Sequence, residues 1–288
     1  MRIGTRASAL ALAQARWVAE RVAVPDGGSA EIIEIRTAGD RGEALNDKSR
    51  WVSALEAALL DRSIDVAVHS AKDVPAELAA GTELAAVPVR EDPRDALIGF
   101  ESLAAVPVGA SVGTASLRRA AQLRAMRADL NVVELRGNVD TRLRKLDGGD
   151  VDALVLAAAG LIRLGLDDRI DCFLDELVPA AGQGALALQT LVGGAMVDNL
   201  GHAVSTAAVM AERAFTAALG ASCHTAVGAR GRVVARQVEL AGWVGLPDGS
   251  EWISDQLVGA HGLIGGELAA RMIAVGAKDL LDRAEAMA

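Results

Sequence analysis

Short β-like runs alternate with longer helical patterns through the first part of the chain. Residues 1–5, 30–38 and 64–68 favour strands, because apolar and β-branched side chains dominate them. Residues 9–23 and 51–62 carry apolar side chains at helical spacing. A βαβαβ alternation is typical of parallel strands joined by crossover helices, with ligands bound at the carboxyl ends of the strands. The sequence therefore predicts an α/β fold with a mostly parallel sheet.

The alternation restarts further along the chain and predicts a second α/β unit. Residues 111–130 and 131–150 each resemble a strand, a turn and a helix, and residues 151–165 resemble a strand that runs into a helix. A proline-rich, charged segment before them, with Pro88 and Pro93, is typical of a connection between domains. Residues 177–190 end in an apolar strand that we expect to return to the first unit.

The pattern changes again near residue 205, where an α+β unit begins. It has a helix, two strands on either side of residues 246–250, and one last helix over residues 267–284. A chain of 288 residues usually divides into more than one domain. We therefore predict three domains, whose limits are 1–88 with 184–202, then 89–183, and then 203–288.

Composition excludes several classes of protein. No apolar stretch is long enough for a membrane helix, and residues 1–17 resemble a strand and an amphipathic helix rather than a cleaved signal, so we expect a cytoplasmic protein. A net charge of −9 and an aromatic content of 2% disfavour nucleic acid as a partner. The two cysteines show no zinc-ligand spacing, so we expect no metal. Any anion site must be a local cluster of positive charge.

Basic side chains crowd one segment of the second unit. Arg118 and Arg119 follow a strand-to-helix turn, where free backbone N–H groups already favour anions. Arg136 ends the next strand, and Arg142 lies one turn into the helix after it. Arginines that converge at strand ends are suited to carboxylates or phosphates. The other basic residues of this segment are interpreted as solvated helix faces: Arg124, Arg127, Arg144 and Lys145.

The first unit has a similar arrangement at two strand ends. Arg6 and Ser8 follow the first strand, and Ser8 serves equally well as a helix N-cap or as a ligand-binding residue. Lys72 and Asp73 follow the strand at residues 64–68 and should reach the same place. Lys72 can anchor an anion, and an ionised Asp73 can stabilise a cation or move a proton, unless the two form only a surface pair. His69 is interpreted as a hydrogen-bonded structural residue.

Cys223 lies among small residues in what resembles an exposed loop. Such a thiol could act as a nucleophile or as a covalent tether. Its neighbour His224 is not expected to form a dyad with it, because adjacent residues seldom face one another. Cys172 is interpreted as a small buried apolar residue.

Nine segments, in order along almost the whole chain, resemble the porphobilinogen deaminase (hydroxymethylbilane synthase) family. Among them are GTRASALALAQ, IDVAVHSAKDVP, REDPRDA, VGTASLRRAAQLR, LRGNVDTRLRKL, PAAGQGALAL and the cysteine loop. The resemblance implies three domains, of which the first two are similar to periplasmic binding proteins. It also implies a dipyrromethane cofactor joined by a thioether to Cys223. Onto this cofactor the family adds four porphobilinogen units, loses ammonia each time, and releases hydroxymethylbilane.

The same resemblance assigns roles to residues. Asp73 matches the catalytic aspartate. The remaining matches are to residues that bind acetate and propionate side chains, with Gln183 a further active-site position: Arg6, Ser8, Lys72, Ser116, Arg118, Arg119, Arg136, Arg142, Arg163 and Gln183. A growing chain of pyrroles brings many carboxylates together, which only a dense basic lining could offset. This accounts for a basic site in an acidic protein.

The sequence departs from the family at three places. Residues 39–51 are shorter than the usual lid loop, Gln189 replaces the usual glutamate, and the cysteine loop reads GASCH. Two other hypotheses remain open: a catalytically silent anion-binding protein of the same fold, which needs neither Asp73 nor Cys223, and a DNA-recognition helix at residues 116–127. We expect a monomeric transferase of tetrapyrrole synthesis, early in the route to haem, with porphobilinogen as substrate and no membrane partner.

Overall fold

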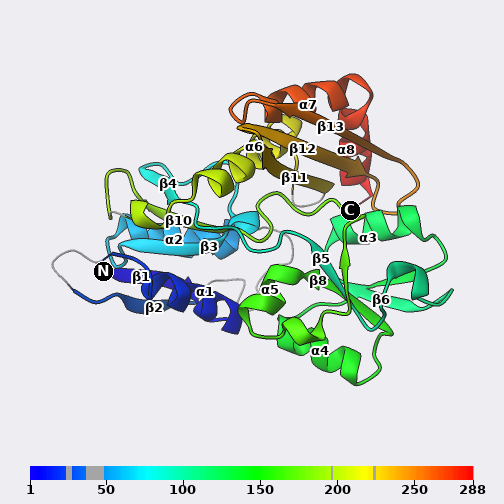
Figure 1. Ribbon diagram of the computed structural model, residues 1–288, viewed down its shortest axis with the longest axis horizontal. Helices are drawn as coiled ribbons and strands as arrows, with labels where there is room; N and C mark the ends of the chain where they lie inside the picture. Colours follow the sequence, from blue (N-terminus) through cyan, green and yellow to red (C-terminus); the bar gives the residue numbers. More distant parts are fainter. Residues whose placement is uncertain (24–27, 37–48, 196, 223–224, 288) are drawn as a thin grey trace.

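The computed structural model describes residues 1–23, 28–36, 49–195, 197–222 and 225–287, which form three β-sheets with helices packed against them (Figure 1). Two sheets are mixed and mostly parallel in their first three strands, and the third is antiparallel. We call the two α/β parts the first and second lobes, and the last part the third unit. The predicted fold class is therefore confirmed. The predicted domain limits remain a prediction.

The first lobe is built on a sheet of order β2-β1-β3-β10-β4. Its elements are β1 (Arg2–Arg6), α1 (Ala9–Ala19), β2 (Glu31–Ile35), α2 (Ser49–Leu60), β3 (Val66–Ser70), β4 (Thr82–Ala86) and β10 (Leu186–Leu191). β3 lies two residues later than predicted, so His69 and Ser70 belong to the strand. A single 3₁₀ turn, Ala71–Asp73, follows it. β10 is antiparallel to its neighbours β3 and β4, as expected of a strand that returns from the second lobe.

The second lobe repeats this arrangement with the order β7-β6-β8-β5-β9. Its elements are β5 (Asp95–Ile98), β6 (Ser111–Thr114), α3 (Leu117–Met126), β7 (Asn131–Glu134), α4 (Val139–Asp147), β8 (Ala153–Ala157), α5 (Ala158–Arg163) and β9 (Cys172–Leu174), with 3₁₀ turns at Leu103–Ala105 and Asp167–Arg169. In both sheets the fourth strand is antiparallel, because it belongs to the segment that has just crossed from the other lobe.

The two connecting segments touch one another between the lobes. The amide of Glu91 donates to the carbonyl of Gly184 at 3.0 Å, and the amide of Ala71 donates to the carbonyl of Ala185 at 2.9 Å. Gly184 has φ +84°, and a Cβ there would lie 2.4 Å from the carbonyl oxygen of Glu91. Only glycine tolerates this conformation and this close approach. The glycine therefore lets the two crossing segments pack backbone against backbone.

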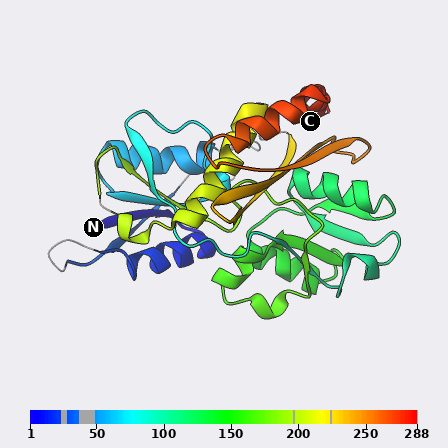
Figure 2. The same cartoon turned by 45° about the horizontal axis from the view of Figure 1, so that its top comes forward.

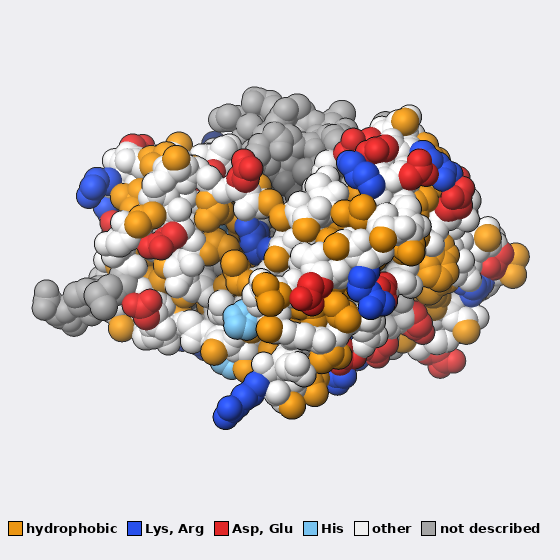
Figure 3. Space-filling model, turned by 90° about the horizontal axis from the view of Figure 1, so that it is seen from above, with side chains coloured by type: hydrophobic (Ala, Val, Ile, Leu, Met, Phe, Trp, Pro, Cys, Tyr) orange, Lys and Arg blue, Asp and Glu red, His pale blue; other side chains and the backbone are white. Residues whose placement is uncertain are grey.

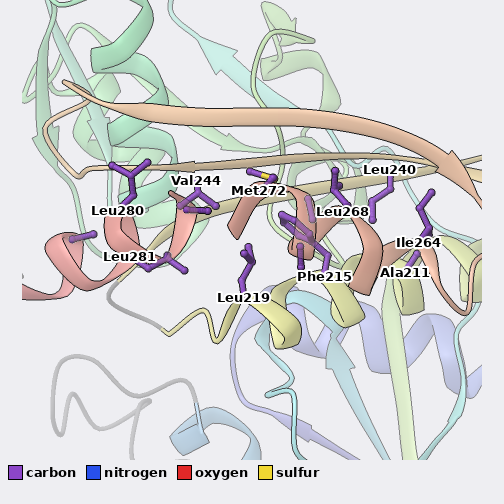
Figure 4. Packing of buried hydrophobic residues seen from close by; sticks show 14 of the residues in the cluster. Ala211, Phe215, Leu219, Leu240, Val244, Ile264, Leu268, Met272, Leu280 and Leu281 are labelled. Atoms are coloured by element: carbon purple, nitrogen blue, oxygen red, sulfur yellow. The ribbon is translucent and has the colours of Figure 1, made fainter. Parts of the chain in front are cut away.

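The third unit lies above both lobes (Figures 1 and 2). It contains α6 (Ala203–Leu219), β11 (Ala226–Val234), β12 (Gln237–Gly245), β13 (Trp252–Gly259), α7 (Ile264–Ala274) and α8 (Ala277–Ala286), after a 3₁₀ turn at Asp198–Leu200. Phe215 of α6 packs with Leu268 and Met272 of α7 against Leu240 of β12 (Figure 4). The single last helix predicted at residues 267–284 is wrong, because the chain turns at Gly276 with φ +104° and starts a second helix.

Helix α6 also joins the third unit to the rest of the chain. Glu212 is fully buried and accepts hydrogen bonds from Arg90 and from the amides of Gly182 and Gly231. The next residue, Arg213, donates to the carbonyls of Val74 and Pro75, which lie directly after Asp73. The third unit therefore supports both the crossing segments and the turn that carries Asp73.

Among the described residues, no helix is long and apolar enough to cross a membrane. On the face shown in Figure 3, basic side chains are scattered among acidic and apolar ones rather than gathered into one patch.

Candidate functional site

A small pocket of about 70 Å³ opens at the carboxyl ends of β1 and β3. Its lining comes from β1, α1, α2, β3 and the 3₁₀ turn: Arg6, Ser8, Leu10, Ala11, Gln14, Val52, Val68, His69, Ser70 and Asp73. The hydroxyl of Ser8 accepts a hydrogen bond from the amide of Ala11 at 3.3 Å and so caps α1. The two roles predicted for Ser8 are compatible, because the capping residue also lies in the pocket. This is the edge of the sheet at which ligands were expected.

Asp73 lies in this pocket, on the turn that follows β3. Its carboxylate makes no hydrogen bond and no ion pair with any residue that the structure describes. Because a half-buried carboxylate usually has such partners, this one is available to a ligand. The structure therefore places the predicted catalytic aspartate where it can meet a positive charge.

Lys72 is half-buried beside Asp73. Burial, together with the positive charge of Arg119, lowers the pKa of the Lys72 ammonium to about 8, although Asp73 and Asp95 act in the opposite direction. No described residue forms a salt bridge with Lys72. An ammonium group in this situation is stabilised by any incoming anion.

Arg118 and Arg119 are buried in the second lobe and share one carboxylate. Arg118 donates through Nη1 to Oδ2 of Asp95 at 2.7 Å, and Arg119 donates through Nε to Oδ1 at 2.8 Å. Gln183, from the returning segment, donates to the same Oδ1 at 2.8 Å. Burial acts to raise the pKa of Asp95, but the two guanidinium charges outweigh it and hold that pKa well below its usual range. Asp95 is the residue that sequence reasoning missed.

The pair of arginines is not neutralised by this single carboxylate. Both residues are only 5% exposed, and burial lowers the pKa of Arg119. The Nε atom of Arg118 is buried and has no hydrogen-bond partner among the described residues. Two cations therefore face one anion, and one buried donor is left over. The carboxylates of a ligand would neutralise the second positive charge and would accept a hydrogen bond from the remaining donor.

Two further predicted arginines lie half-buried near this cluster. Arg142 donates to the carbonyl of Gly137 at 2.8 Å, and Arg163 donates to the carbonyl of Gly184 at 2.7 Å. Burial lowers the pKa of each guanidinium to about 10, and the charge of Arg119 adds to this effect at Arg142. Neither has a salt bridge to a described residue. They add two half-buried cations that have no salt bridge to a described carboxylate.

The other binding residues predicted in the second lobe lie at its edge. The hydroxyl of Ser116 caps α3 and lines a separate, mostly apolar pocket of about 280 Å³ between α3 and β7. Arg136 is exposed and forms an ion pair of 2.6 Å with the exposed Glu134. The structure therefore does not bring Arg136 into the buried cluster. In this arrangement it can meet a ligand only at the rim.

The prediction of solvated helix faces is confirmed for Arg144, which is exposed, whereas Lys145 is half-buried. It is wrong for Arg124 and Arg127. Arg124 donates to the carbonyl of Pro247 in the third unit at 2.8 Å, and Arg127 donates to the carbonyl of Leu103 at 2.7 Å. Both hydrogen bonds join segments that are far apart in the chain, and a local sequence pattern does not reveal such contacts.

Cys223 and His224 lie outside the described residues, and so does the predicted lid loop up to residue 48. The prediction that Cys223 carries a cofactor therefore remains a prediction. Cys172 is partly exposed in β9 rather than buried. His69 is buried and hydrogen-bonded, as predicted.

Two family models match the sequence almost end to end. The model described as "Porphobilinogen deaminase, dipyromethane cofactor binding domain" matches residues 1–198, and "Porphobilinogen deaminase, C-terminal domain" matches residues 206–274. The chain belongs to the porphobilinogen deaminase family. A porphobilinogen deaminase from Deinococcus deserti is 47% identical, covering 98% of each chain. One from Thermus thermophilus is 47% identical, covering 89% of each chain.

Solved structures outside this family are less similar. Immunogenic lipoprotein A from Vibrio vulnificus is 16% identical, with a TM-score of 0.42 over 66% of this chain and 87% of that chain. A nutrient binding protein from Burkholderia cenocepacia bound to methionine is 15% identical, with a TM-score of 0.41 over 69% of this chain and 86% of that chain.

Proposed function

We propose that the chain is a transferase that joins four porphobilinogen molecules head to tail and releases hydroxymethylbilane. The main observation behind this proposal is an excess of buried and half-buried positive charge in the site that contains Asp73. Lys72, Arg142 and Arg163 have no salt bridge to a described residue, and Asp73, which follows Lys72 in the chain, has no hydrogen bond to one. Porphobilinogen carries two carboxylates and an aminomethyl group, so it supplies the anions and the cation that this site lacks.

The same residues fit a dipyrromethane cofactor. We propose that it is attached through a thioether to Cys223. When bound, it would supply a nucleophilic pyrrole carbon to which the first substrate is added. Its acetate and propionate groups would accept hydrogen bonds from Arg118 Nε, a buried donor without a partner among the described residues, and from the neighbouring guanidinium groups. Cofactor binding would then neutralise the cations that burial destabilises.

Asp73 has the central role in the proposed reaction. In each addition the carbon–nitrogen bond of the aminomethyl group breaks, ammonia leaves, a carbon–carbon bond forms, and a pyrrole proton is lost. The methylene carbon and the ring are positively charged between these events. A carboxylate without other partners can hold the substrate ammonium, stabilise that positive charge and accept the proton. Lys72 would hold a substrate carboxylate close to this point.

The remaining proposed contacts are to acetate and propionate groups. Arg118, Arg119 and Gln183 form the buried part of this surface with Asp95. The other proposed contacts come from the first-lobe pocket, from the edge of the second lobe and from the half-buried arginines: Arg6, Ser8, Ser116, Arg136, Arg142 and Arg163. Planar guanidinium groups suit carboxylates because two parallel N–H groups can bind the two oxygens. A cluster shared by two lobes can also hold a chain that lengthens during the reaction.

Intact-mass measurement and an ammonia assay test the proposal together. The chain, produced with ample porphobilinogen, should carry a mass increment of two linked pyrroles, and the Cys223→Ser variant should not. The wild-type protein should also release four ammonia molecules for each hydroxymethylbilane formed. An unmodified wild-type mass without ammonia release would instead favour a silent anion-binding protein.

Three further expectations belong to this proposal. We propose that the enzyme is monomeric, that it is cytoplasmic, and that its domains have the limits predicted from the sequence. Light scattering, cell fractionation and limited proteolysis test these expectations in turn. Cleavage within β10 or the crossing segments before any cleavage near residue 203 would contradict the limits.

A further inference from the structure

His69 and Gln189 lie on the same face of the first-lobe sheet. His69 pairs with Ala187 across β3 and β10, and Gln189 pairs with Ala67, two residues earlier on β3. Side chains at such diagonal positions are within reach of one another. Nε2 of His69 lies 3.0 Å from Oε1 of Gln189, and both side chains are buried. The ring is therefore held from one side by the neighbouring strand.

The orientation of the Gln189 amide follows from its other two contacts. Its nitrogen lies 2.8 Å from the hydroxyl of Thr82 and 2.9 Å from Oε1 of Glu56. The Thr82 hydroxyl donates its own proton to the carbonyl of Ala79 at 2.7 Å, so it accepts from Gln189. Oε1 of Glu56 also accepts from the amide of Ala79 at 3.0 Å, so it acts as an acceptor here. The amide nitrogen must point to these two acceptors, which leaves the amide oxygen for His69.

The tautomer of His69 then follows. Because the Gln189 oxygen can only accept, Nε2 of His69 must carry the proton and donate it. Burial lowers the pKa of His69 to about 4, although Gln189, Glu56 of α2 and Asp73 of the 3₁₀ turn raise it, while Arg6 of β1 lowers it further. The ring is therefore neutral at pH 7, with its lone pair on Nδ1. No described residue forms a hydrogen bond with Nδ1.

His69 also lines the pocket that contains Asp73, Arg6 and Ser70. A ligand in this pocket would meet the carboxylate of Asp73 and the neutral ring of His69. A neutral acceptor attracts an N–H group without the like-charge repulsion that an imidazolium would impose on an ammonium.

We propose that His69 is a substrate-positioning acceptor, whose Nδ1 binds an N–H group of the incoming aminomethyl-pyrrole beside Asp73, and that Gln189 fixes the tautomer that makes this possible. This inference rests on the proposed function, since porphobilinogen supplies the N–H group. It assigns the His69 and Asp73 side of the pocket to the amine of the substrate, whereas Arg6, Ser8 and the arginine cluster serve its carboxylates.

Two variants separate this role from a structural one. In His69→Gln, the amide nitrogen can replace Nε2 and keep the contact with Gln189, but nothing replaces the acceptor Nδ1. In His69→Asn, the amide oxygen occupies the place of Nδ1, but the donor to Gln189 is lost. The first variant should therefore keep the fold and lose substrate positioning. The second should keep more of the positioning and lose stability, because the buried Gln189 oxygen has no donor.

The test combines nitrogen NMR of the histidine rings with steady-state kinetics on the cofactor-loaded protein. The His69 signals, identified by their loss in His69→Gln, should show a neutral ring with the proton on Nε2 at pH 7. His69→Gln should lower kcat/KM by about tenfold to a hundredfold, the size expected for a hydrogen bond to a charged group, with an unchanged melting temperature. His69→Asn should lower the melting temperature and reduce kcat/KM less.

The possible outcomes distinguish the two proposals. A wild-type protein that releases no ammonia from porphobilinogen would overturn the proposed function. A wild-type protein that is active, together with a proton on Nδ1 or a His69→Gln variant of unchanged kcat/KM, would overturn only the positioning role of His69.

Discussion

The two lobes place a carboxylate at equivalent points and treat it in opposite ways. Asp73 follows β3, the third strand of the first sheet, and Asp95 pairs with Ala157, the last residue of β8, the third strand of the second sheet. Asp95 is fully buried and accepts hydrogen bonds from Arg118, Arg119 and Gln183. Asp73 accepts none from the described residues.

This difference separates a structural carboxylate from an available one. Asp95 compensates part of the charge of two buried arginines and holds their side chains in place. Asp73 lies among cations without being bound to them. Carboxylates at the same edge of similar sheets can therefore have different roles, and their hydrogen-bond partners distinguish them better than their position does.

Asp73→Asn should have the largest effect on the reaction. The rate of ammonia release should fall roughly 100- to 10,000-fold, the range for loss of a proton-transferring group. The free energy of unfolding should change by less than about 1 kcal/mol, because no hydrogen bond to a described residue is lost. Single-turnover kinetics and urea unfolding of the same preparation check both parts. A rate within tenfold of wild type would show that the available carboxylate is not the catalytic one.

Asp95→Asn should have the largest effect on stability. It leaves two buried guanidinium groups without a counter-charge, so the free energy of unfolding should fall by about 3–5 kcal/mol. Asp129→Asn is the matched control, because Asp129 forms an ion pair of 2.7 Å with Arg127 at the surface. That control should cost less than about 1 kcal/mol. Equal losses in the two variants, measured by urea unfolding, would remove the distinction between the lobes.

Lys72 should produce an alkaline limit to activity. Its lowered pKa of about 8 means that the ammonium loses its proton as the pH rises through 8, while substrate carboxylates stay ionised. The value of kcat/KM, which reports on the free enzyme, should therefore fall above pH 8. In Lys72→Arg this fall in kcat/KM should move to a pH above the measured range, because arginine keeps its charge. An identical fall in both proteins would assign the titration to another group.

Arg136→Gln should have the smallest effect. Arg136 is exposed and paired with an exposed glutamate, so the free energy of unfolding should change by less than about 0.5 kcal/mol. A rim contact to one carboxylate should raise KM only a few-fold and leave kcat unchanged. A rise in KM as large as that of Arg142→Gln would show that Arg136 acts inside the buried cluster during turnover.

Much of the fold could be predicted because its signals are local. The alternation of strand and helix patterns revealed both lobes, and the apolar run after Gly184 revealed the strand that returns to the first sheet. The last helix was harder, since residues 267–284 keep a helical pattern through Gly276. Only the backbone conformation of that glycine divides them into α7 and α8.

The site could be predicted in its residue types but not in its balance of charge. Arginines at strand ends indicated an anion site, and Asp73 was identified from its place after β3. Asp95 was missed because an acid before the apolar residues 96–98 resembles an exposed strand end. The signal was present in Arg118 and Arg119, since two adjacent buried arginines require a counter-charge. Arg124 was misjudged because its partner, the carbonyl of Pro247, lies 123 residues away.

The central feature of the site is an excess of positive charge, which the carboxylates of its ligand are expected to neutralise. The most direct test measures thermal unfolding of the Cys223→Ser variant, which has no covalent cofactor, with porphobilinogen and with 2-(aminomethyl)pyrrole, which lacks both carboxylates. Porphobilinogen at a hundredfold excess over its Kd should stabilise the protein by about 3 kcal/mol, and the analogue at the same concentration should not. The account would be contradicted if both ligands stabilised the protein equally, or if neither ligand stabilised it.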